Sequence, residues 1–259
     1  MNVLAILQAR VSSTRLPGKI LKPILGKPMI IRQIEREMHV ASIDKLVVAT
    51  STDFSDDELV KVLDKNHISV YRGSLDNVLD RYYKTANLYK PDHVVRITGD
   101  CPLADPDVID RVILEHIKYD ADYTTNCLPP SWPDGLDVEV MKMNVLKTIW
   151  QESKLPSELE HVTPFIRKHS HRFKIHNVAS EVDLSMLRWT VDEKEDFEYV
   201  TNIYENLYPK DSNFRTIDIL NYIDSNPYIS HINSHYNRNE GSKSSAIKDK
   251  AYLSEKNKC

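Results

Sequence analysis

The chain has 259 residues, of which 41% are apolar and 28% charged, a composition typical of a globular protein with a sizeable core. The 38 acidic residues outnumber the 34 lysines and arginines, and this net charge of -4 argues against general nucleic-acid binding. The chain shows no apolar run long enough for a membrane span, no secretory signal pattern and no CxxC among its three cysteines. We therefore expect a cytoplasmic protein without a disulfide framework or a zinc site.

Positive charge is concentrated at the start of the chain. Residues 1–34 include no acidic residue and six basic ones. An apolar strand is predicted at residues 3–7, and the loop after it carries Arg10, Arg15 and Lys19. Guanidinium forks and ammonium groups suit polyphosphate oxygens, so this loop is a candidate phosphate site. A solvated basic surface loop is the alternative.

The following segments alternate between apolar runs and amphipathic stretches. Strands are predicted at 45–50, 68–71 and 93–98, and helices at 28–40, 55–65, 74–88 and 105–117. This alternation predicts a three-layer α/β/α sandwich, with a mostly parallel sheet between two helical layers. Ligands bind such sheets beyond the carboxyl ends of the strands. The basic loop should therefore meet Ser51-Thr52-Asp53 and Gly99-Asp100 at that edge.

The second half of the chain is less regular. Two predicted strands flank a Pro-rich loop at 128–135, and we expect them to form a small antiparallel arm over about 122–142. The remaining predicted elements are helices at 157–168, 193–207 and 216–223, an alternating segment at 173–178 and a strand at 187–191. Polar residues dominate 233–259, which predicts a flexible tail after a single domain at 1–232.

Several motifs resemble those of a known family. QARVSSTRLPGKIL with GKPMI, RITGDCPL, and WTVDEKEDFE, in this order, resemble the cytidylyltransferases that activate sugar acids, the CMP-Kdo and CMP-acylneuraminate synthetases. YRGSLDNVLDRY, LPPSWPDGLDVEV and EHVTPFI are similar to the spore-coat polysaccharide biosynthesis proteins. The resemblance extends over about residues 1–225, although Gln8 stands where the sugar-acid synthetases usually have proline. It implies a nucleotide-diphosphosugar-transferase-like fold, Mg²⁺ as cofactor, CTP and a sugar acid as substrates, and often a homodimer.

The resemblance also implies which residues bind the nucleotide and the metal. Arg10, Arg15 and Lys19 would hold the triphosphate, with Arg10 and Lys19 taking part in catalysis. Further nucleotide contacts are implied for Ala9, Ser12, Ser13, Arg72, Ser74 and Asp76. Asp100, the carboxylate after strand 93–98, would be catalytic and would bind Mg²⁺ together with Asp192. For Asp192, the N-cap of a helix in a capping box with Glu195 remains an alternative.

The acceptor would lie against the second half of the chain. The candidate residues for it are Asp134, Asp137, Glu139, Glu160 and His161, and a structural role remains an alternative for His161. The implied reaction is attack of a sugar hydroxyl on the α-phosphate of CTP, with release of pyrophosphate.

Three other classes compete with this interpretation. A sugar-1-phosphate nucleotidyltransferase, using CTP or another nucleotide, usually opens with a Gly-rich loop, whereas this chain has no glycine before Gly18. A glycosyltransferase of similar fold needs a DxD motif, which GDCPLADPD approximates only loosely. A non-catalytic nucleotide-binding protein would be expected to lack the basic loop or Asp100. The P-loop pattern is absent from the sequence.

Overall fold

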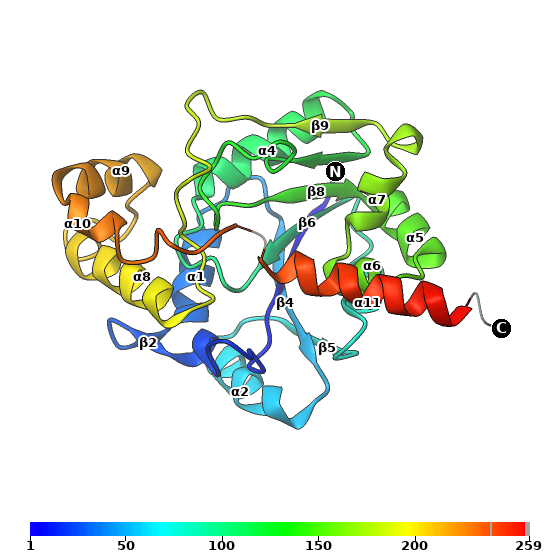
Figure 1. The fold of residues 1–259 in the computed structure, drawn as a ribbon, viewed down its shortest axis with the longest axis horizontal. Coiled ribbons are helices and arrows are strands. Elements are labelled where there is room, and N and C mark those ends of the chain that lie inside the picture. Colours follow the sequence, from blue (N-terminus) through cyan, green and yellow to red (C-terminus); the bar gives the residue numbers. More distant parts are fainter. Residues whose placement is uncertain (239, 257–259) are drawn as a thin grey trace.

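The computed structural model describes residues 1–238 and 240–256, and a seven-stranded sheet runs through it (Figure 1). The strand order is β5-β4-β1-β6-β8-β7-β9, and every neighbouring pair is parallel except the two that involve β8. The strands are β1 (Val3–Gln8), β4 (Lys45–Ser51), β5 (Val70–Gly73), β6 (His93–Thr98), β7 (Tyr123–Thr125), β8 (Glu139–Lys142) and β9 (Ile175–Asn177), with a separate hairpin of β2 (Pro23–Ile24) and β3 (Lys27–Pro28). The mostly parallel sheet is as predicted.

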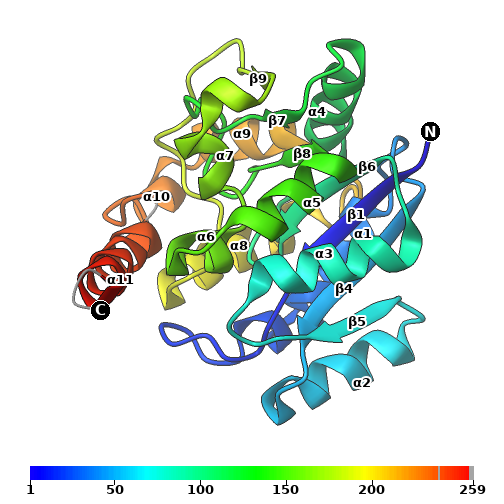
Figure 2. The ribbon, with the colours of Figure 1, turned by 90° about the vertical axis from the view of Figure 1, so that its right-hand side faces the viewer.

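Helices cover both faces of this sheet (Figure 2). Along β1, Val3, Ala5 and Leu7 belong to one core cluster and Leu4 and Ile6 to the other, because side chains alternate between the faces of a strand. The first cluster packs under α1 (Met29–Glu37), α2 (Asp57–Lys65), α4 (Pro106–Lys118), α8 (Lys194–Leu207) and α9 (Thr216–Ser225). The second packs under α3 (Val78–Tyr89), α5 (Met143–Glu152), α6 (Pro156–His161) and α7 (Pro164–Lys168). The predicted three-layer sandwich is confirmed.

The two strands of the predicted arm at 122–142 pair antiparallel as expected, but they belong to the main sheet and do not form an arm of their own. β8 lies inside the sheet, antiparallel to β6 on one side and to β7 on the other. The physical reason is burial on both faces, since Val140 packs into the first core cluster and Met141 into the second. Because β8 runs backwards, its first residue, Glu139, lies opposite Arg96 near the carboxyl end of β6.

Three further elements differ from the prediction. The helix α5 has no counterpart among the predicted elements. The helix expected at 157–168 is divided into α6 and α7, because Val162 has a φ of 70° and Pro164 begins a new helix. The strand expected at 187–191 is an extended segment with one isolated bridge, between Arg188 and Asp134. Its backbone hydrogen bonds go to loops, so it joins the loops at the sheet edge instead of extending the sheet.

The C-terminal segment also differs from the expected flexible tail. After α10 (Pro227–Ser230), buried Asn233 donates to the Arg188 carbonyl (3.0 Å) and to Asp196 (2.9 Å). The helix α11 (Glu240–Lys256) then lies along α6, where Asp249 accepts from the N–H (2.9 Å) and the hydroxyl (2.6 Å) of Ser157. The prediction for residues 239 and 257–259 falls outside the described residues. Within the described ranges, no helix combines the length and apolar character needed to cross a membrane.

Candidate active site

A cleft of about 720 Å³ opens at the carboxyl edge of the parallel strands. It is bordered by the loops after β1 and β6, the loop before β8, and the α6–α7 segment. Most of the predicted site residues line it, whereas Ser51, Thr52 and Asp53 do not. The predicted residues that line it are Ala9, Arg10, Ser13, Arg15, Lys19, Asp100, Asp134, Asp137, Glu139, Glu160, His161 and Asp192.

The basic loop after β1 is tied to the neighbouring strand. The N–H of Val11 donates to buried Asp56 (2.7 Å), which also accepts from the N–H of Ser51 at the end of β4 (3.1 Å). The loop closes with a hydrogen bond from the N–H of Gly18 to the Val11 carbonyl (3.2 Å). Gly18 has a φ of 68°, a left-handed conformation that glycine adopts without strain, and Lys19 follows it into the cleft.

Lys19 lies between two carboxylates. Its ammonium nitrogen is 2.9 Å from Asp192 Oδ1 and 3.7 Å from Asp100 Oδ2, and it donates to the Val191 carbonyl (2.6 Å). Burial by itself lowers the pKa of Lys19, but the two carboxylates outweigh burial and raise that pKa above its usual value. Burial likewise opposes ionisation of Asp100, and the nearby ammonium lowers the pKa of Asp100 below its usual value. Lys19 and Asp100 are therefore both charged at neutral pH.

Backbone contacts fix the position of Asp100. The preceding N–H, from Gly99, donates to the Gln8 carbonyl (2.8 Å), so the loops after β6 and β1 are in direct contact. The Asp100 carbonyl accepts from the N–H of Val191 (2.8 Å), and the next N–H along the chain donates to buried Gln33 of α1 (3.2 Å). Three separate elements thus hold this carboxylate at the edge of the sheet.

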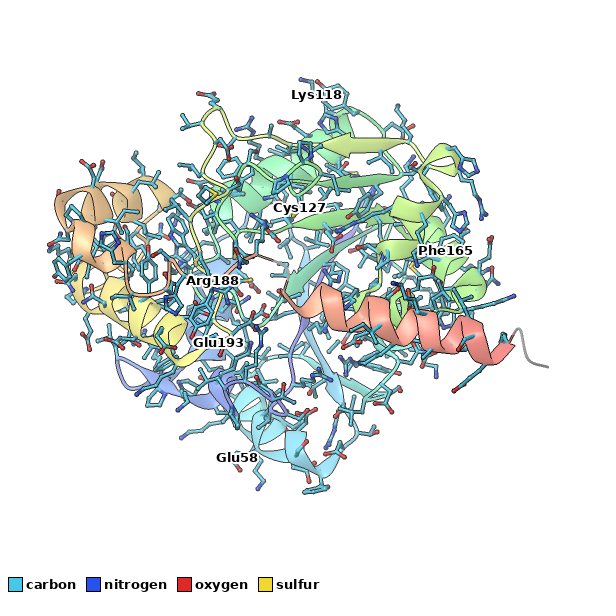
Figure 3. All side chains as sticks on the ribbon, viewed as in Figure 1. Glu58, Lys118, Cys127, Phe165, Arg188 and Glu193 are labelled. Atoms are coloured by element: carbon cyan, nitrogen blue, oxygen red, sulfur yellow. The ribbon has the colours of Figure 1, made fainter. Side chains whose placement is uncertain are left out.

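Asp192 does not cap α8, so the capping-box alternative is wrong. The N-cap is Glu193, and the N3 residue is Asp196, which accepts from the N–H groups of Asp192 and Glu193 (2.9 Å each). The side chain of Asp192 is turned toward the cleft, where Arg15 approaches it at 2.9 Å. Arg15 also pairs with Glu193 (3.2 Å), which Figure 3 shows near the start of α8.

A second charged group occupies the other half of the cleft. Arg188 approaches Asp134 at 3.4 Å, and Arg238 pairs with Asp137 while its Nε lies 3.9 Å from Asp134. Burial and the neighbouring Asp137 raise the pKa of Asp134 to about 7, against the opposing effect of the two guanidinium groups. Figure 3 shows Arg188 near the centre of the molecule.

Gly135 allows the loop before β8 to approach the 187–191 segment closely. Its φ is 110°, and a Cβ at this position would lie 2.6 Å from the backbone nitrogen of Thr190. The close approach is held by backbone hydrogen bonds from Asp134 to the Leu187 carbonyl (2.9 Å) and from Trp189 to the Asp134 carbonyl (2.6 Å). It places the loop carrying Asp134 against the segment that leads to Asp192, the partner of Lys19.

Glu139 is held by four side chains that come from β6, β7 and α7 with its N-cap residue. It pairs with Arg96 and accepts from Tyr123, from Thr163 (2.7 Å) and from Arg167 (3.4 Å). Burial opposes ionisation, but the two arginines prevail and the pKa of Glu139 is lowered. Because both of its carboxylate oxygens are hydrogen-bonded, Glu139 links β6, β7 and α7 at the border of the cleft.

Glu160 and His161 contact the C-terminal helix. His161 Nε2 lies 2.7 Å from the Ser245 hydroxyl, and Lys248 lies 3.1 Å from Glu160. Burial lowers the pKa of His161, so its ring is neutral at neutral pH. Both side chains line the cleft while also anchoring α11.

Four further predicted residues do not line the cleft: Ser12, Arg72, Ser74 and Asp76. Arg72 donates to the carbonyls of Ser51 (2.8 Å) and Asp53 (3.0 Å), so it holds the loop after β4. Ser74 accepts from the N–H of Asn77, which caps α3.

Sequence reasoning missed several arginines that the fold brings to the site. Arg96, Arg167 and Arg188 line the cleft, and Arg238 reaches its two aspartates. The sequence signal for Arg188 was its place just before the WTVD motif. Nothing in the sequence around Arg238 pointed to a site more than a hundred residues earlier in the chain.

A mostly parallel α/β sheet with a basic loop and paired carboxylates at its carboxyl edge is the architecture of a nucleotidyltransferase. A family model described as "Cytidylyltransferase" matches residues 4–253. The chain belongs to this cytidylyltransferase family and is a nucleotidyltransferase.

Individual relatives agree with this assignment. The chain is 35% identical over 211 residues to the spore coat polysaccharide biosynthesis protein SpsF of Bacillus subtilis, covering 79% of this chain and 87% of that protein. It superposes with a TM-score of 0.86 on a cytidylyltransferase from Leptospira borgpetersenii, with 31% identity and coverage of 92% and 100%. A CMP:2-keto-3-deoxy-manno-octonic acid synthetase complexed with CTP superposes with a TM-score of 0.61 at 17% identity, covering 79% of this chain and 99% of that one, and shows the shared fold.

Proposed function

We propose that this protein is a Mg²⁺-dependent CTP:sugar-acid cytidylyltransferase that serves the synthesis of a cell-surface polysaccharide or glycan. An acceptor hydroxyl oxygen would form a bond to the α-phosphorus of CTP, the bond from that phosphorus to the β-phosphate oxygen would break, and pyrophosphate would leave as the hydroxyl proton is lost to solvent. The observation that carries this proposal is the position of Lys19 between Asp100 and Asp192, at the base of the basic loop.

The chain's own basic residues would bind and orient the triphosphate. Arg10, Arg15 and Lys19 enter the same cleft, where they would neutralise charge that builds on the phosphate oxygens and on departing pyrophosphate. Ala9 and Ser13 line the cleft beside them and would contribute further nucleotide contacts. Positioning and charge stabilisation are what phosphoryl transfer requires of a protein.

Asp100 and Asp192 fit a magnesium ion. Both offer hard carboxylate oxygens, and both already face one cation, the Lys19 ammonium. Among the described residues, no cluster of three or more His, Cys, Asp or Glu side chains could hold a metal. Mg²⁺ commonly takes only one or two carboxylates, with nucleotide phosphates completing its shell. When bound, the ion would polarise phosphate oxygens.

The other half of the cleft would receive the acceptor. Its lining includes side chains that can accept hydrogen bonds from hydroxyl groups, those of Asp134, Asp137, Glu160 and His161. Half-exposed Arg167 offers a cation for the carboxylate of a sugar acid. Glu139 would act indirectly, because its oxygens already hold the cleft floor.

Pyrophosphate release tests this proposal directly. The four nucleoside triphosphates would be crossed with a panel of sugar acids and sugar phosphates, with and without Mg²⁺. We expect release with CTP and a sugar acid, dependent on Mg²⁺. Release only with a sugar 1-phosphate would reassign the protein to the competing transferase class, and preference for another nucleotide would overturn the CTP assignment.

The family resemblance also supports a homodimer and a cytoplasmic location, which we include in the proposal. Sedimentation equilibrium of the purified protein should give twice the monomer mass. A monomer mass at micromolar concentration would contradict the dimer without affecting the proposed reaction.

A further inference from the structure

The chain between α10 and α11 crosses the molecule (Figure 1). It carries Arg238, which pairs with Asp137, a residue that lines the cleft. Asn233 anchors this segment to Arg188 and Asp196, and Tyr236 donates to Glu195 (3.1 Å). These contacts bring Arg238 to the acceptor half of the cleft, which is otherwise formed by segments at 127–139 and 160–167.

Arg238 holds two partly buried carboxylates and a carbonyl, and the side chain of Asp137 is 35% exposed. One terminal nitrogen donates to the Trp132 carbonyl (2.9 Å), the other donates to Asp137, and Nε lies 3.9 Å from Asp134. The side chains of Arg238 and Asp134 are only 14% and 15% exposed. A guanidinium fork that spans three groups from one loop fixes their relative positions in a way that a single ammonium cannot.

The charge of the Asp134 and Asp137 carboxylates determines which ligand groups can bind beside them. Burial and the neighbouring Asp137 raise the pKa of Asp134, against the effect of Arg238 and Arg188. Burial raises the pKa of Asp137, and Arg238 opposes this rise, so the negative charge of both aspartates depends on the guanidinium groups. A second anion placed here would meet two carboxylates in a poorly solvated cleft. Hydroxyl groups are suitable partners, because each can donate a hydrogen bond to a carboxylate oxygen.

We propose that Arg238 is a specificity-determining residue that positions Asp134 and Asp137 to accept hydrogen bonds from the hydroxyl groups of a saccharide acceptor. This inference rests on the proposed function, whose acceptor half it describes. It makes residues 233–238 a support of the active site, which acts on the acceptor through Asp134 and Asp137.

The test is a kinetic comparison of Arg238→Ala and Arg238→Lys with the unmodified enzyme. The matched control is Arg172→Ala, which removes an arginine paired with Glu152 on the surface. We expect the KM for the sugar acid identified by the panel to rise about tenfold or more in Arg238→Ala, since unpaired polar groups in a site weaken hydroxyl recognition strongly. The KM for CTP should stay within about twofold. Arg238→Lys should recover part of the loss, and Arg172→Ala should match the unmodified enzyme.

Two further measurements make the result decisive. Melting temperature and CTP calorimetry establish that each variant folds, and Arg238→Lys replaces Arg238→Ala if the alanine variant does not fold. An unchanged acceptor KM in a folded variant would overturn the inference while leaving the proposed function intact. A rise in the KM for CTP equal to that for the acceptor would overturn it as well.

The proposed function can fail separately. If the unmodified enzyme releases no pyrophosphate, calorimetry with 3-deoxy-manno-octulosonate and N-acetylneuraminate replaces the kinetic assay. Binding of either sugar that weakens about tenfold in Arg238→Ala would support the subsite although the transfer reaction is refuted. No binding of either sugar to the unmodified enzyme would overturn the subsite too.

Discussion

Lys19 pairs with two aspartates from separate loops, Asp100 after β6 and Asp192 before α8. Without its ammonium, Asp100 would lose this cation, whereas Asp192 would keep its pair with Arg15. The Lys19 side chain would contact phosphate when CTP binds. A single lysine therefore contributes to stability in the free enzyme and to nucleotide binding in the loaded one.

Lys19→Ala tests both contributions. We expect the free energy of unfolding to fall by about 1–3 kcal/mol, because partly buried Asp100 loses its charged partner and Asp192 keeps only its arginine pairs. Millimolar Mg²⁺ should raise the melting temperature of this variant more than that of the unmodified protein, since the ion can replace the missing cation. Sodium chloride at equal ionic strength is the control, and an equal response to both salts would refute a metal site at these carboxylates.

Asp100→Asn tests the carboxylate itself. Turnover should fall by about two orders of magnitude or more, since the amide cannot supply the anionic ligand or the charge. The fold should persist, because the backbone contacts of this loop do not involve the side chain. Exposed Asp64, on α2, gives the control variant Asp64→Asn. Near-normal turnover in Asp100→Asn would remove this residue from the mechanism.

Part of the site could be predicted because local patterns placed it. The charge of the basic loop and the position of Asp100 directly after a buried strand were sufficient to locate both at one sheet edge. The engagement of Arg72 with the carbonyls of Ser51 and Asp53 was not predictable, because it depends on how two loops meet in three dimensions. Arg238 was missed for the same reason.

At the scale of elements, α1 holds the loop after β6 in place. Its residue Gln33 donates to the Thr98 carbonyl (2.8 Å) and to Glu37 (2.7 Å), and it also accepts the N–H after Asp100. Burial raises the pKa of Glu37 to about 8, so this carboxyl is protonated at neutral pH. Its other oxygen is buried without a hydrogen-bond partner among the described residues, as suits a neutral acid.

This buried acid predicts a pH dependence of stability. The folded-state pKa of Glu37, about 8, exceeds the ordinary value of 4.5, so the native state binds the proton more tightly than the unfolded chain does. Its stabilising contribution is complete below about pH 4.5 and declines as the pH rises toward 8. In urea unfolding, the free energy of unfolding of Glu37→Gln should increase relative to that of the unmodified protein by up to about 1.4 kcal/mol per pH unit over that range. Parallel pH profiles would disprove a neutral Glu37.

The C-terminal elements predict graded effects of truncation. Ending the chain after residue 238 removes α11 and its bonds to Ser157 and His161, so the melting temperature should fall by several degrees. Ending it after residue 232 also removes the bonds of Asn233 to Arg188 and Asp196, and should cost more. Thermal denaturation measures both. Equal melting temperatures for all three chains would show that the segment contributes nothing to stability.

Element prediction succeeded where apolar periodicity was strong and failed where contacts decided the structure. The strands β1 and β4 contain continuous apolar runs, and β6 is rich in β-branched residues, so all three could be assigned directly. The C-terminal segment has a polar sequence, and its helix is held by side chains of α6 instead of a broad apolar face. The division between α6 and α7 at Val162 likewise reflects packing, since that residue is fully buried with a positive φ.

At the scale of the whole molecule, the carboxyl edge of the sheet carries two half-sites, one around the basic loop and one around Asp134 and Asp137. The basic loop and its aspartates should bind the nucleotide when no acceptor is present. Saturation with Mg²⁺ and CTP at about 100 times Kd should stabilise the fold by about 2.7 kcal/mol, which thermal shift assays detect as a higher melting temperature. The other three nucleotides at the same concentration serve as controls. An equal shift with all four would contradict selectivity for cytosine.

The reversed direction of β8 also determines how this enzyme could be redesigned. Because this strand starts at the ligand edge, the loop of residues 126–138 that precedes it reaches the cleft, on the side away from the loop after β1. Protein engineers could therefore exchange that loop, together with residues 233–238, as a cassette that alters the sugar used. The nucleotide-binding loop, which is built from another part of the chain, could be left unchanged.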